Sequence, residues 1–576
     1  MRTDALAQLC CDNGAAWCSD PQSWHAMVTT SHDLCEALMP ALAKALNEIH
    51  DRNMSVRFWQ IVIGPWLGQF VGVICDRVSL LESAPDQGWD DTGAQTARII
   101  PRTVYESIKL IETTEFGDQL LLDVDKVMRG HSVALAGEKF THSRDHLTFG
   151  SKIDFVGPNP LLRNIFNIYK RVLTPRGAVV VSNASIPYRL HHALRKQAKR
   201  IRSVVPVQDP AHHYDAPPNV EARAKLAGHL SVDGHGLAQI IAQLIPSYLP
   251  LCFLEAFSKM IGLSRKYPTA PSAILMGTEI YGRYESFCYW AASNVESGTF
   301  LATMQHGGTY GNENASEFVF PEIAPVDRFY SWGWKWPKYG LDVSKITPMP
   351  AMFLVGVEPT SMKAASDTNK DILFVSTALH PNVRRLCGSE GRPYYNDDYV
   401  KQQGTFYHSL APVVRDQLVV RLYPGGFGDR YRDKWVARSP DVRIDDASRS
   451  FDHALDQCHI FVTDHLSTTW LQALSLNKPS VLFIDFDQYD FTREALGWMR
   501  QLQDAKILHD SPQSAADHIA AIANDVDAWW AAGTTQTVLA AFLEVFAFRP
   551  ENAMQLWAEE LNGLSRVADM PKQRQS

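Results

Sequence analysis

The feature that most constrains the fold is a regular alternation of short apolar runs and longer amphipathic stretches through residues 372–508. Apolar runs of three to five residues are typical of strands buried on both faces, and the amphipathic stretches between them are typical of crossover helices. Strand–helix alternation of this kind predicts a doubly wound, parallel α/β sheet. The predicted strands are residues 372–375, 418–422, 442–444, 460–462, 481–484 and 506–508.

The first half of the chain shows a less regular version of the same pattern. Residues 1–115 are predicted to be rich in helix, because leucines recur four residues apart from Leu34 to Leu46. Apolar runs then predict strands at residues 120–124, 177–183, 273–277, 300–304 and 328–332.

A chain of 576 residues exceeds the roughly 250–300 residues that one hydrophobic core supports, so two large domains are expected. We place the first domain at residues 1–345 and the second at 346–540, with the crossing beginning near residues 346–350. A helix in residues 541–565 is predicted to return to the first domain, and residues 566–576 form a polar tail predicted to be disordered.

The overall charge argues against nucleic acid as a partner. The net charge is −8, so the overall field repels nucleic acid.

The first residues lack the apolar core of a signal peptide and no run approaches about 18 apolar residues, which predicts a cytoplasmic protein. Nine scattered cysteines lack metal-site spacing and are expected to be free thiols. A basic helix is predicted after the strand at residues 177–183, and its charged side is either a solvated face or a contact for an anionic acceptor or membrane. Its basic residues are Arg189, Arg195, Lys196, Lys199, Arg200 and Arg202.

The first candidate site follows the predicted strand at residues 300–304, where the sequence reads Gln305-His306-Gly307-Gly308. Glycines at the carboxyl end of a parallel strand let the backbone approach a ligand, and this edge of an α/β sheet is where ligands bind. His306 can donate to a phosphate or sugar oxygen, or act as an acid or base. The alternative is a tight turn with a hydrogen-bonded histidine.

Two further candidate sites follow strands of the second domain. Arg421 and Tyr423 end one strand, where an arginine can hold a diphosphate or form a structural salt bridge. Asp464 follows another strand and precedes the hydroxyl-rich run Ser467–Thr469, and we place both Asp464 and Tyr423 among the residues expected to contact the nucleotide. That run begins a predicted helix, so Ser467, Thr468, Thr469 and backbone N–H groups can bind an anion; simple N-capping by Ser467 is the alternative.

Carboxylates near the histidine are the candidates for a general base or nucleophile. Glu279, Glu285 and Glu317 flank His306 in sequence. Two D-x-D triplets, at residues 123–125 and 485–487, could hold a divalent metal. We expect no metal and no cofactor, because arginine and a helix terminus already supply positive charge to a phosphate.

Missing motifs exclude other enzyme classes. The sequence has no G-x-x-x-x-G-K-[ST] loop and no G-x-G-x-x-G after a strand, so evidence for an ATPase or a nicotinamide dehydrogenase is lacking. It also has no G-x-S-x-G nucleophile elbow of a hydrolase.

Several motifs in combination resemble the transferases encoded in bacterial O-antigen clusters, over about residues 55–545. They are Arg57-Phe58-Trp59 with Gly64-Pro65-Trp66-Leu67, Gln305-His306-Gly307-Gly308 with Tyr310-Gly311, Ser331-Trp332-Gly333-Trp334, Arg421-Leu422-Tyr423-Pro424 and Ser467-Thr468-Thr469. That family is similar to GT-B transferases that use CMP-activated 3-deoxy-manno-octulosonic acid (Kdo). The resemblance implies two Rossmann-like domains facing a central cleft, with the nucleotide at Arg421 and residues 467–469, and with His306 and a carboxylate facing sugar and acceptor.

The resemblance implies a glycosyltransferase that moves Kdo or a related ulosonic acid from a CMP donor to a surface polysaccharide or lipopolysaccharide acceptor. The acceptor would be a glycan or lipid-linked glycan, reached at the inner face of the cytoplasmic membrane. No segment before His306 matches the aspartate nucleophile of retaining Kdo transferases, so retention and inversion both stay open. The rival functions are a polyol-phosphate transferase of teichoic-acid type, a nucleotide-sugar epimerase and a non-catalytic carbohydrate-binding scaffold.

Overall fold

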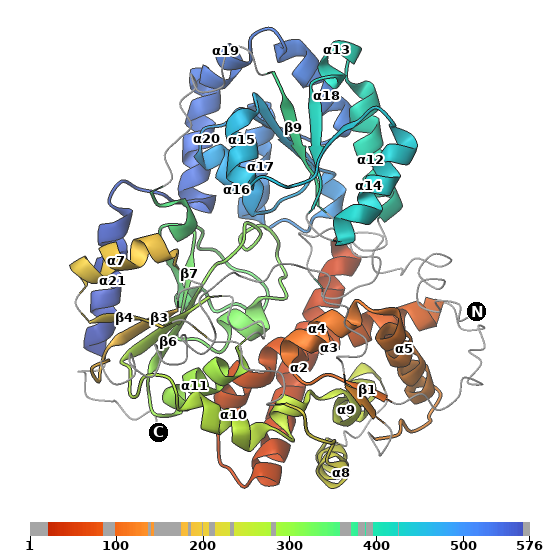
Figure 1. Ribbon diagram of the computed structural model, residues 1–576, viewed down its shortest axis with the longest axis vertical. Helices are drawn as coiled ribbons and strands as arrows, with labels where there is room; N and C mark the ends of the chain where they lie inside the picture. Colours follow the sequence, from red (N-terminus) through yellow and green to blue (C-terminus); the bar gives the residue numbers. More distant parts are fainter. Residues whose placement is uncertain are drawn as a thin grey trace.

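The chain forms two lobes, one above the other in Figure 1, each built on a six-stranded parallel sheet. The computed structural model describes residues 21–567 except 84–97, 136–139, 143–173, 183–185, 199, 205, 207–213, 231–235, 278–283, 357–369, 378–385, 387–395 and 424–425. Two doubly wound domains facing each other confirm the predicted GT-B-like fold.

The sheet of the N-terminal lobe has the strand order β4-β3-β5-β6-β7-β8, with every neighbouring pair parallel. Its strands are β3 (Val179–Ser182), β4 (Ile201–Val204), β5 (Ala273–Met276), β6 (Phe300–Met304), β7 (Arg328–Ser331) and β8 (Ile346–Pro348). The four predicted strands within residues 177–332 are confirmed. The predicted basic helix ends at Gln197, earlier than expected, because the residues that include Arg202 form β4 instead. Residues 346–348, where we expected the crossing to begin, form β8 and pair with β7 in this first sheet.

The sheet of the C-terminal lobe has the order β11-β10-β9-β12-β13-β14, again wholly parallel. Its strands are β9 (Ile372–Val375), β10 (Leu418–Arg421), β11 (Arg443–Asp445), β12 (Ile460–Thr463), β13 (Ser480–Phe483) and β14 (Leu508–His509). All six predicted strands are present. The apolar runs predicted them well because both faces of this sheet are buried.

Helices cover both faces of the C-terminal sheet (Figure 1). Successive residues of β9 point to opposite sides: Phe374 joins a core with α12, α14 and α18, whereas Leu373 joins the core with α15, α16, α17 and α20. The helices of this lobe are α12 (Asn396–Ser409), α13 (Pro412–Arg415), α14 (Gly426–Arg438), α15 (Phe451–Gln457), α16 (Thr468–Ser475), α17 (Arg493–Asp504), α18 (Pro512–Ile522), α19 (Val526–Ala531) and α20 (Gly533–Phe546).

The N-terminal lobe is rich in helix, as predicted. Its helices are α2 (Pro21–His50), α3 (Val56–Ser83), α4 (Val104–Ile111), α5 (Thr114–Met128), α7 (Tyr188–Gln197), α8 (Val220–His229), α9 (Leu237–Tyr248), α10 (Phe257–Ser264) and α11 (Glu285–Glu296). Five of them, α2, α4, α5, α9 and α11, pack against α3. A two-stranded parallel pair, β1 (Arg98–Ile100) and β2 (Phe140–His142), completes this part. Among the described helices α3 alone is long and apolar enough to cross a membrane, but 83% of its most apolar window is buried inside the protein.

The predicted strand at residues 120–124 is wrong, because these residues lie in the middle of α5. Leu120, Leu121 and Val124 are buried, and their spacing places them on one face of a helix. An apolar run this short fits a buried helix as well as a strand, so periodicity alone could not separate the two.

The chain ends by returning to the first lobe, as predicted. The last helix, α21 (Ala553–Val567), packs against α7 and β3. Trp557 is buried there, and its indole N–H donates to the Pro350 carbonyl at 2.9 Å. Arg328 at the start of β7 forms an ion pair with Glu560.

Candidate active site

Gln305 fixes the loop that leaves β6. Its side chain is buried, and its amide N–H donates to the Gly307 carbonyl at 2.7 Å. Its amide oxygen accepts from the Trp332 backbone N–H at 3.0 Å and from the Trp334 indole N–H at 2.8 Å. Because β6 and β7 are parallel neighbours, both segments leave the sheet at the same edge. The glutamine therefore ties the two loops together and holds His306 in place.

His306 lies in a hydrogen-bonded chain that ends on a buried carboxylate. The Tyr310 hydroxyl is 2.6 Å from the His306 Nδ1 atom and donates to Glu322 Oε2 at 2.5 Å. Glu322, in the short π-helix Val319–Ile323, is only 1% exposed, and its other oxygen is 3.6 Å from Nδ1. Since the one hydroxyl proton goes to Glu322, Nδ1 must carry the proton that His306 shares with Tyr310. In the neutral ring, Nε2 is then left with a lone pair that can accept a proton.

The two glycines after His306 contact the other lobe. A Cβ built on Gly308 would lie 2.3 Å from the Ser467 carbonyl oxygen and 3.1 Å from the Thr468 backbone nitrogen. A Cβ on Gly307 would lie 3.7 Å from Thr468 Oγ1, which is ordinary van der Waals contact. The structure thus brings together two predicted sites that are about 160 residues apart in sequence. Only glycine fits at position 308 without movement of a backbone.

The start of α16 lies at the contact with Gly308. Ser467 occupies the N-cap position, yet its side chain accepts no hydrogen bond from the first turn. Its hydroxyl instead lies 2.8 Å from the Thr469 hydroxyl. The first-turn N–H groups and the positive end of the helix dipole therefore face the junction without a capping oxygen from Ser467. The capping alternative accounts for the position of Ser467 but not for its contacts.

Asp464 lies three residues before Ser467, and its carboxylate is held by α12 and by His465. Its carboxylate accepts from the Tyr399 hydroxyl and from the Gln403 amide, both at 2.8 Å, and it lies 3.0 Å from His465 Nδ1. Burial, followed by the nearby Asp464 charge, raises the pKa of Tyr399 well above its ordinary value. These contacts anchor Asp464, at the end of β12, to α12.

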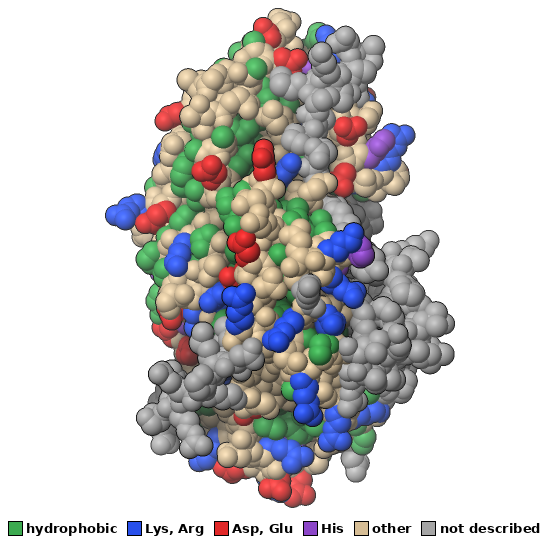
Figure 2. Space-filling model, turned by 90° about the vertical axis from the view of Figure 1, so that its left-hand side faces the viewer, with side chains coloured by type: hydrophobic (Ala, Val, Ile, Leu, Met, Phe, Trp, Pro, Cys, Tyr) green, Lys and Arg blue, Asp and Glu red, His purple; other side chains and the backbone are tan. Residues whose placement is uncertain are grey.

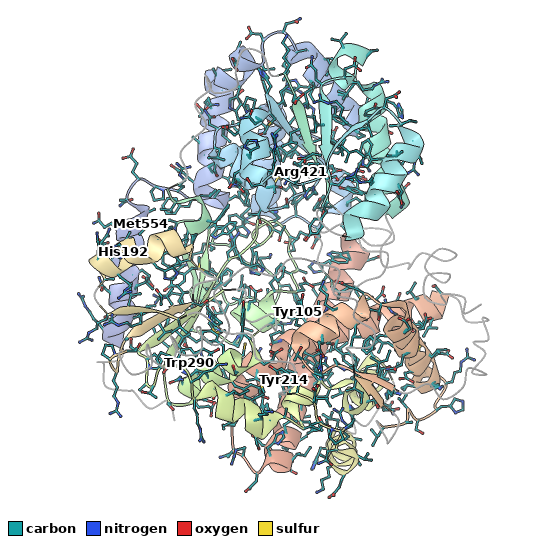
Figure 3. The ribbon with its side chains drawn as sticks, in the orientation of Figure 1. Tyr105, His192, Tyr214, Trp290, Arg421 and Met554 are labelled. Carbon is teal, nitrogen blue, oxygen red and sulfur yellow. The ribbon has the colours of Figure 1, made fainter. Side chains whose placement is uncertain are left out.

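Arg421 lies at the carboxyl end of β10, and Figure 3 shows it at the end of the upper lobe that faces the lower one. Its guanidinium donates to Asp445 at 2.5 Å and to the Arg449 carbonyl at 2.8 Å. The structural salt bridge, one of the two roles considered for Arg421, is therefore present. Tyr423, two residues on, is half-exposed.

The carboxylate that the structure places beside His306 is Glu322, which is not one of the three glutamates predicted as base or nucleophile. Glu285 begins α11 and is buried, with the Tyr214 hydroxyl donating to it at 3.2 Å. Figure 3 shows Tyr214 deep in the lower lobe, well away from Arg421. Glu317 is partly buried in the loop after the His-Gly turn, and Glu279 lies outside the described residues.

Glu322 was missed because the sequence shows it as one carboxylate inside the apolar run from Phe318 to Ile323. A charged side chain is almost never fully buried without a partner, so a carboxylate in such a run, shortly after His306, was the available signal.

The two D-x-D triplets serve structural roles. Asp123 on α5 pairs with Arg98 and accepts from the Tyr248 hydroxyl at 2.6 Å, and Asp125 pairs with Arg129 one helical turn away. Asp485 accepts from the Asp487 backbone N–H at 3.0 Å. Within the part of the chain that the structure describes, no three His, Cys, Asp or Glu residues gather as a metal site would require.

Comparison with solved structures finds distant neighbours. The wall teichoic acid polymerase TagF aligns at 12% identity and a TM-score of 0.38, covering 71% of this chain and 97% of that one. The O-GlcNAc transferase of Thermobaculum terrenum aligns at 11% identity and 0.36, covering 99% of each chain. A UDP-N-acetylglucosamine 2-epimerase aligns at 13% and 0.37, covering 70% and 99%.

No curated protein matches the sequence. A family model matches residues 15–561, nearly the whole chain, and its description is LIC12162 family transferase. The helical part, both sheets and most of α21 lie inside the match. The chain therefore belongs to the LIC12162 family of transferases.

Proposed function

We propose that this transferase moves a sugar from a nucleotide-activated donor to an acceptor hydroxyl at the junction of its two lobes. The observation that carries the proposal is the contact of Gly307 and Gly308 with residues 467–468 of the other lobe. That contact places a histidine with a buried carboxylate behind it next to a helix N-terminus. A general base and an anion site in one place match the two charges that glycosyl transfer develops.

In this proposal His306 is the general base. Its Nε2 atom takes the proton of the acceptor hydroxyl as the acceptor oxygen bonds to the anomeric carbon. Tyr310 keeps the Nδ1 proton in place, and the negative charge of Glu322 stabilises the imidazolium that forms (Nδ1 to Oε1, 3.6 Å). The bond from the anomeric carbon to the donor phosphate breaks, and its electron pair leaves with the nucleotide. A direct displacement of this kind inverts the anomeric carbon.

The start of α16 holds the departing phosphate. Backbone N–H groups of the first turn, with the hydroxyls of Thr468 and Thr469, supply donors whose interaction strengthens as negative charge develops. Because these donors stabilise the phosphate, the proposed reaction needs no metal. In the proposal Arg421 does not bind the phosphate itself, because its guanidinium pairs with Asp445; this ion pair instead holds the ends of β10 and β11 in place.

For the donor we propose a CMP-activated ulosonic acid such as Kdo, and for the acceptor a surface glycan or lipid-linked glycan. The support is the set of sequence motifs that resemble O-antigen cluster transferases. The donor's own carboxylate would add a second anion to the site.

A thermal-shift screen of CMP, CDP, UDP and GDP tests the nucleotide. A ligand at about 100 times its Kd stabilises by about 2.7 kcal/mol, so the cognate nucleotide should raise the melting temperature clearly, and we expect CMP to do so. Preference for UDP or GDP would overturn the ulosonic acid donor and leave the transferase. No shift with any of the four would count against a nucleotide site.

His306→Ala tests the base. Turnover of the donor that the screen selects should fall by about 10²–10⁴ while the nucleotide-induced shift is kept. His453→Ala, at an exposed histidine on α15, is the matched control. Wild-type turnover in His306→Ala would refute the assignment.

A further inference from the structure

The chain carries an unusual block of positive charge. Residues 155–208 contain ten Lys or Arg and no Asp or Glu, in a protein whose net charge is −8. The rest of the chain therefore holds all of the acidic excess. Charge separated this sharply within one chain points to an anionic partner for the basic part.

Four of the described basic residues of this block lie at one edge of the N-terminal sheet. Arg176 lies three residues before the first residue of β3, Arg200 directly precedes β4, and the two strands are parallel neighbours. Arg195 and Lys196 lie in the last turn of α7, which runs back to the same edge. All four side chains are exposed. We call these four residues the basic edge.

Figure 2 looks at this side of the molecule and shows Lys and Arg side chains gathered over the N-terminal lobe, with few acidic side chains among them. The lobe is the same one that supplies His306. His306 follows the carboxyl end of β6, whereas the basic edge lies at the amino ends of β3 and β4. A strand of four or five residues spans about 15 Å, so a flat partner on the basic edge leaves the lobe junction clear.

We propose that the basic edge docks the protein on an anionic lipid bilayer. Exposed, flexible side chains from separate segments suit a flat surface of lipid phosphates, which needs no shape match. Insertion through α3 is not available, because this helix is mostly buried in the lobe's core. The anionic leaflet that such residues meet in a cell is the cytoplasmic one, which agrees with the predicted cytoplasmic location.

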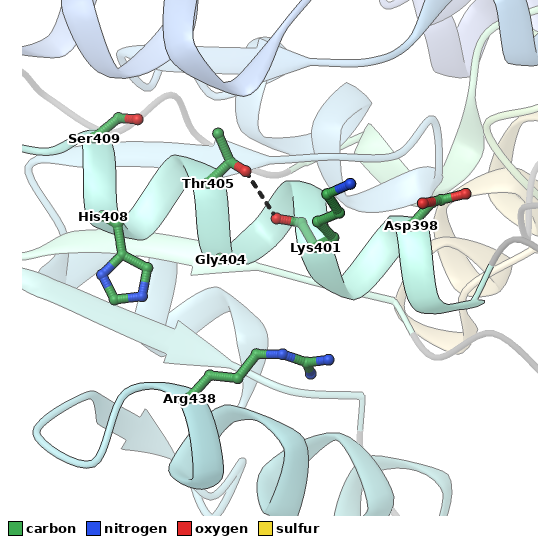
Figure 4. A pocket seen from close by; sticks show the side chains of 7 residues that line it. All are labelled: Asp398, Lys401, Gly404, Thr405, His408, Ser409 and Arg438. Carbon is green, nitrogen blue, oxygen red and sulfur yellow. Dashed lines mark hydrogen bonds between the residues drawn. The ribbon is translucent and has the colours of Figure 1, made fainter.

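A second cationic surface on the other lobe provides a control. Lys401 and Arg438 line a hollow of about 800 Å³ between α12 and α14, beside His408 and Asp398 (Figure 4). These side chains are exposed too, and Arg493 on α17 is 93% exposed. The hollow includes an acidic side chain, whereas the block at residues 155–208 has none.

Co-sedimentation with lipid vesicles tests the proposal in the full-length protein at about 0.1 M NaCl. We expect binding to phosphatidylcholine vesicles that contain about 30% phosphatidylglycerol, weak binding to pure phosphatidylcholine, and release at about 0.5 M NaCl. The variant Arg176→Gln, Arg195→Gln, Lys196→Gln should bind the anionic vesicles about 100-fold more weakly, since each basic residue near such a surface contributes about a factor of five. Its melting temperature should stay at the wild-type value because all three side chains are exposed.

The control variant Lys401→Gln, Arg438→Gln, Arg493→Gln removes the same charge from the other lobe and should bind as wild type does. Equal loss in both variants would show that net charge, not the basic edge, decides binding. Failure of the wild-type protein to bind anionic vesicles would overturn the proposal. Binding to soluble dextran sulfate without binding to vesicles would assign the basic edge to an acidic polymer instead. Each result is independent of whether the junction transfers a sugar.

Discussion

Replacing Gly308 by alanine tests whether close contact between the lobes sets the geometry of the site. The added Cβ would lie 2.3 Å from the Ser467 carbonyl oxygen and 2.7 Å from its carbonyl carbon. Non-bonded carbon atoms normally sit about 3.5–4.0 Å apart, so the two backbones must separate by about 1 Å. A displacement of this size between reacting groups costs about 100-fold in rate, and we expect a loss of about that size in kcat/KM. Forced overpacking should also cost about 1–3 kcal/mol of stability, measurable by urea denaturation.

The neighbouring glycine is the matched control. A Cβ on Gly307 would lie 3.7 Å from Thr468 Oγ1, which needs no movement. Neither glycine has a positive φ, so alanine introduces no backbone strain at either position. Gly307→Ala should therefore keep kcat/KM within about threefold of wild type. Equal kinetics and stability in the two variants would refute the reasoning, because they differ only in the space beside the added methyl group.

Two further predictions follow from buried ionisable groups. Tyr310→Phe and Glu322→Gln should each lower kcat by about 10-fold or more. Glu322→Gln should also move the acidic limb of the pH–rate profile to lower pH, because the His306 imidazolium loses the negative charge beside it. The control is Tyr339→Phe, which removes an exposed hydroxyl bonded to Asp33. An unchanged pH–rate profile in Glu322→Gln would exclude a role for Glu322 behind His306. Burial lowers the pKa of His509 and His518 to about 4, so the unfolded chain binds more protons between about pH 4 and 6.5 and stability falls as the pH falls through that range. Each histidine should lower the free energy of unfolding by about 1–2 kcal/mol when the pH falls from 7 to 5. Urea denaturation at both pH values should show a smaller fall in this free energy for His518→Gln than for the wild type. An equal fall would contradict this account.

The fold was largely readable from the sequence where burial dictates composition. Strands such as β9 and β12 are covered by helices on both faces, so all of their residues except Thr463 are apolar and the runs stand out. The same rule failed at residues 120–124, because a helix that packs between other helices also shows a short apolar run. Only contacts distant in sequence separate these cases, and a single sequence does not display them.

The site was readable in its parts but not in its connections. Glycines after β6 and hydroxyls before α16 are signals of local geometry, and both were found. The partner of His306 was not, because Glu322 acts through Tyr310, and the three meet only after the chain has turned through Val319–Ile323. The sequence could not tell whether Arg421 binds a phosphate or pairs with a carboxylate. The pairing of β10 with β11, which sets Arg421 opposite Asp445, decides this.

The segment after His306 belongs to the first lobe by sequence and to the second by several of its contacts. The Asn312 carbonyl accepts from the Thr492 backbone N–H at 2.8 Å, the Asn314 N–H donates to the Asp490 carbonyl at 2.9 Å, and Glu313 forms an isolated bridge with Phe491. Separation of the lobes would break these bonds together with the contact at Gly308. The position of His306 relative to α16 therefore depends on the lobes being together. A base that is aligned only in that state would activate an acceptor hydroxyl when water is excluded, which protects an activated donor from hydrolysis.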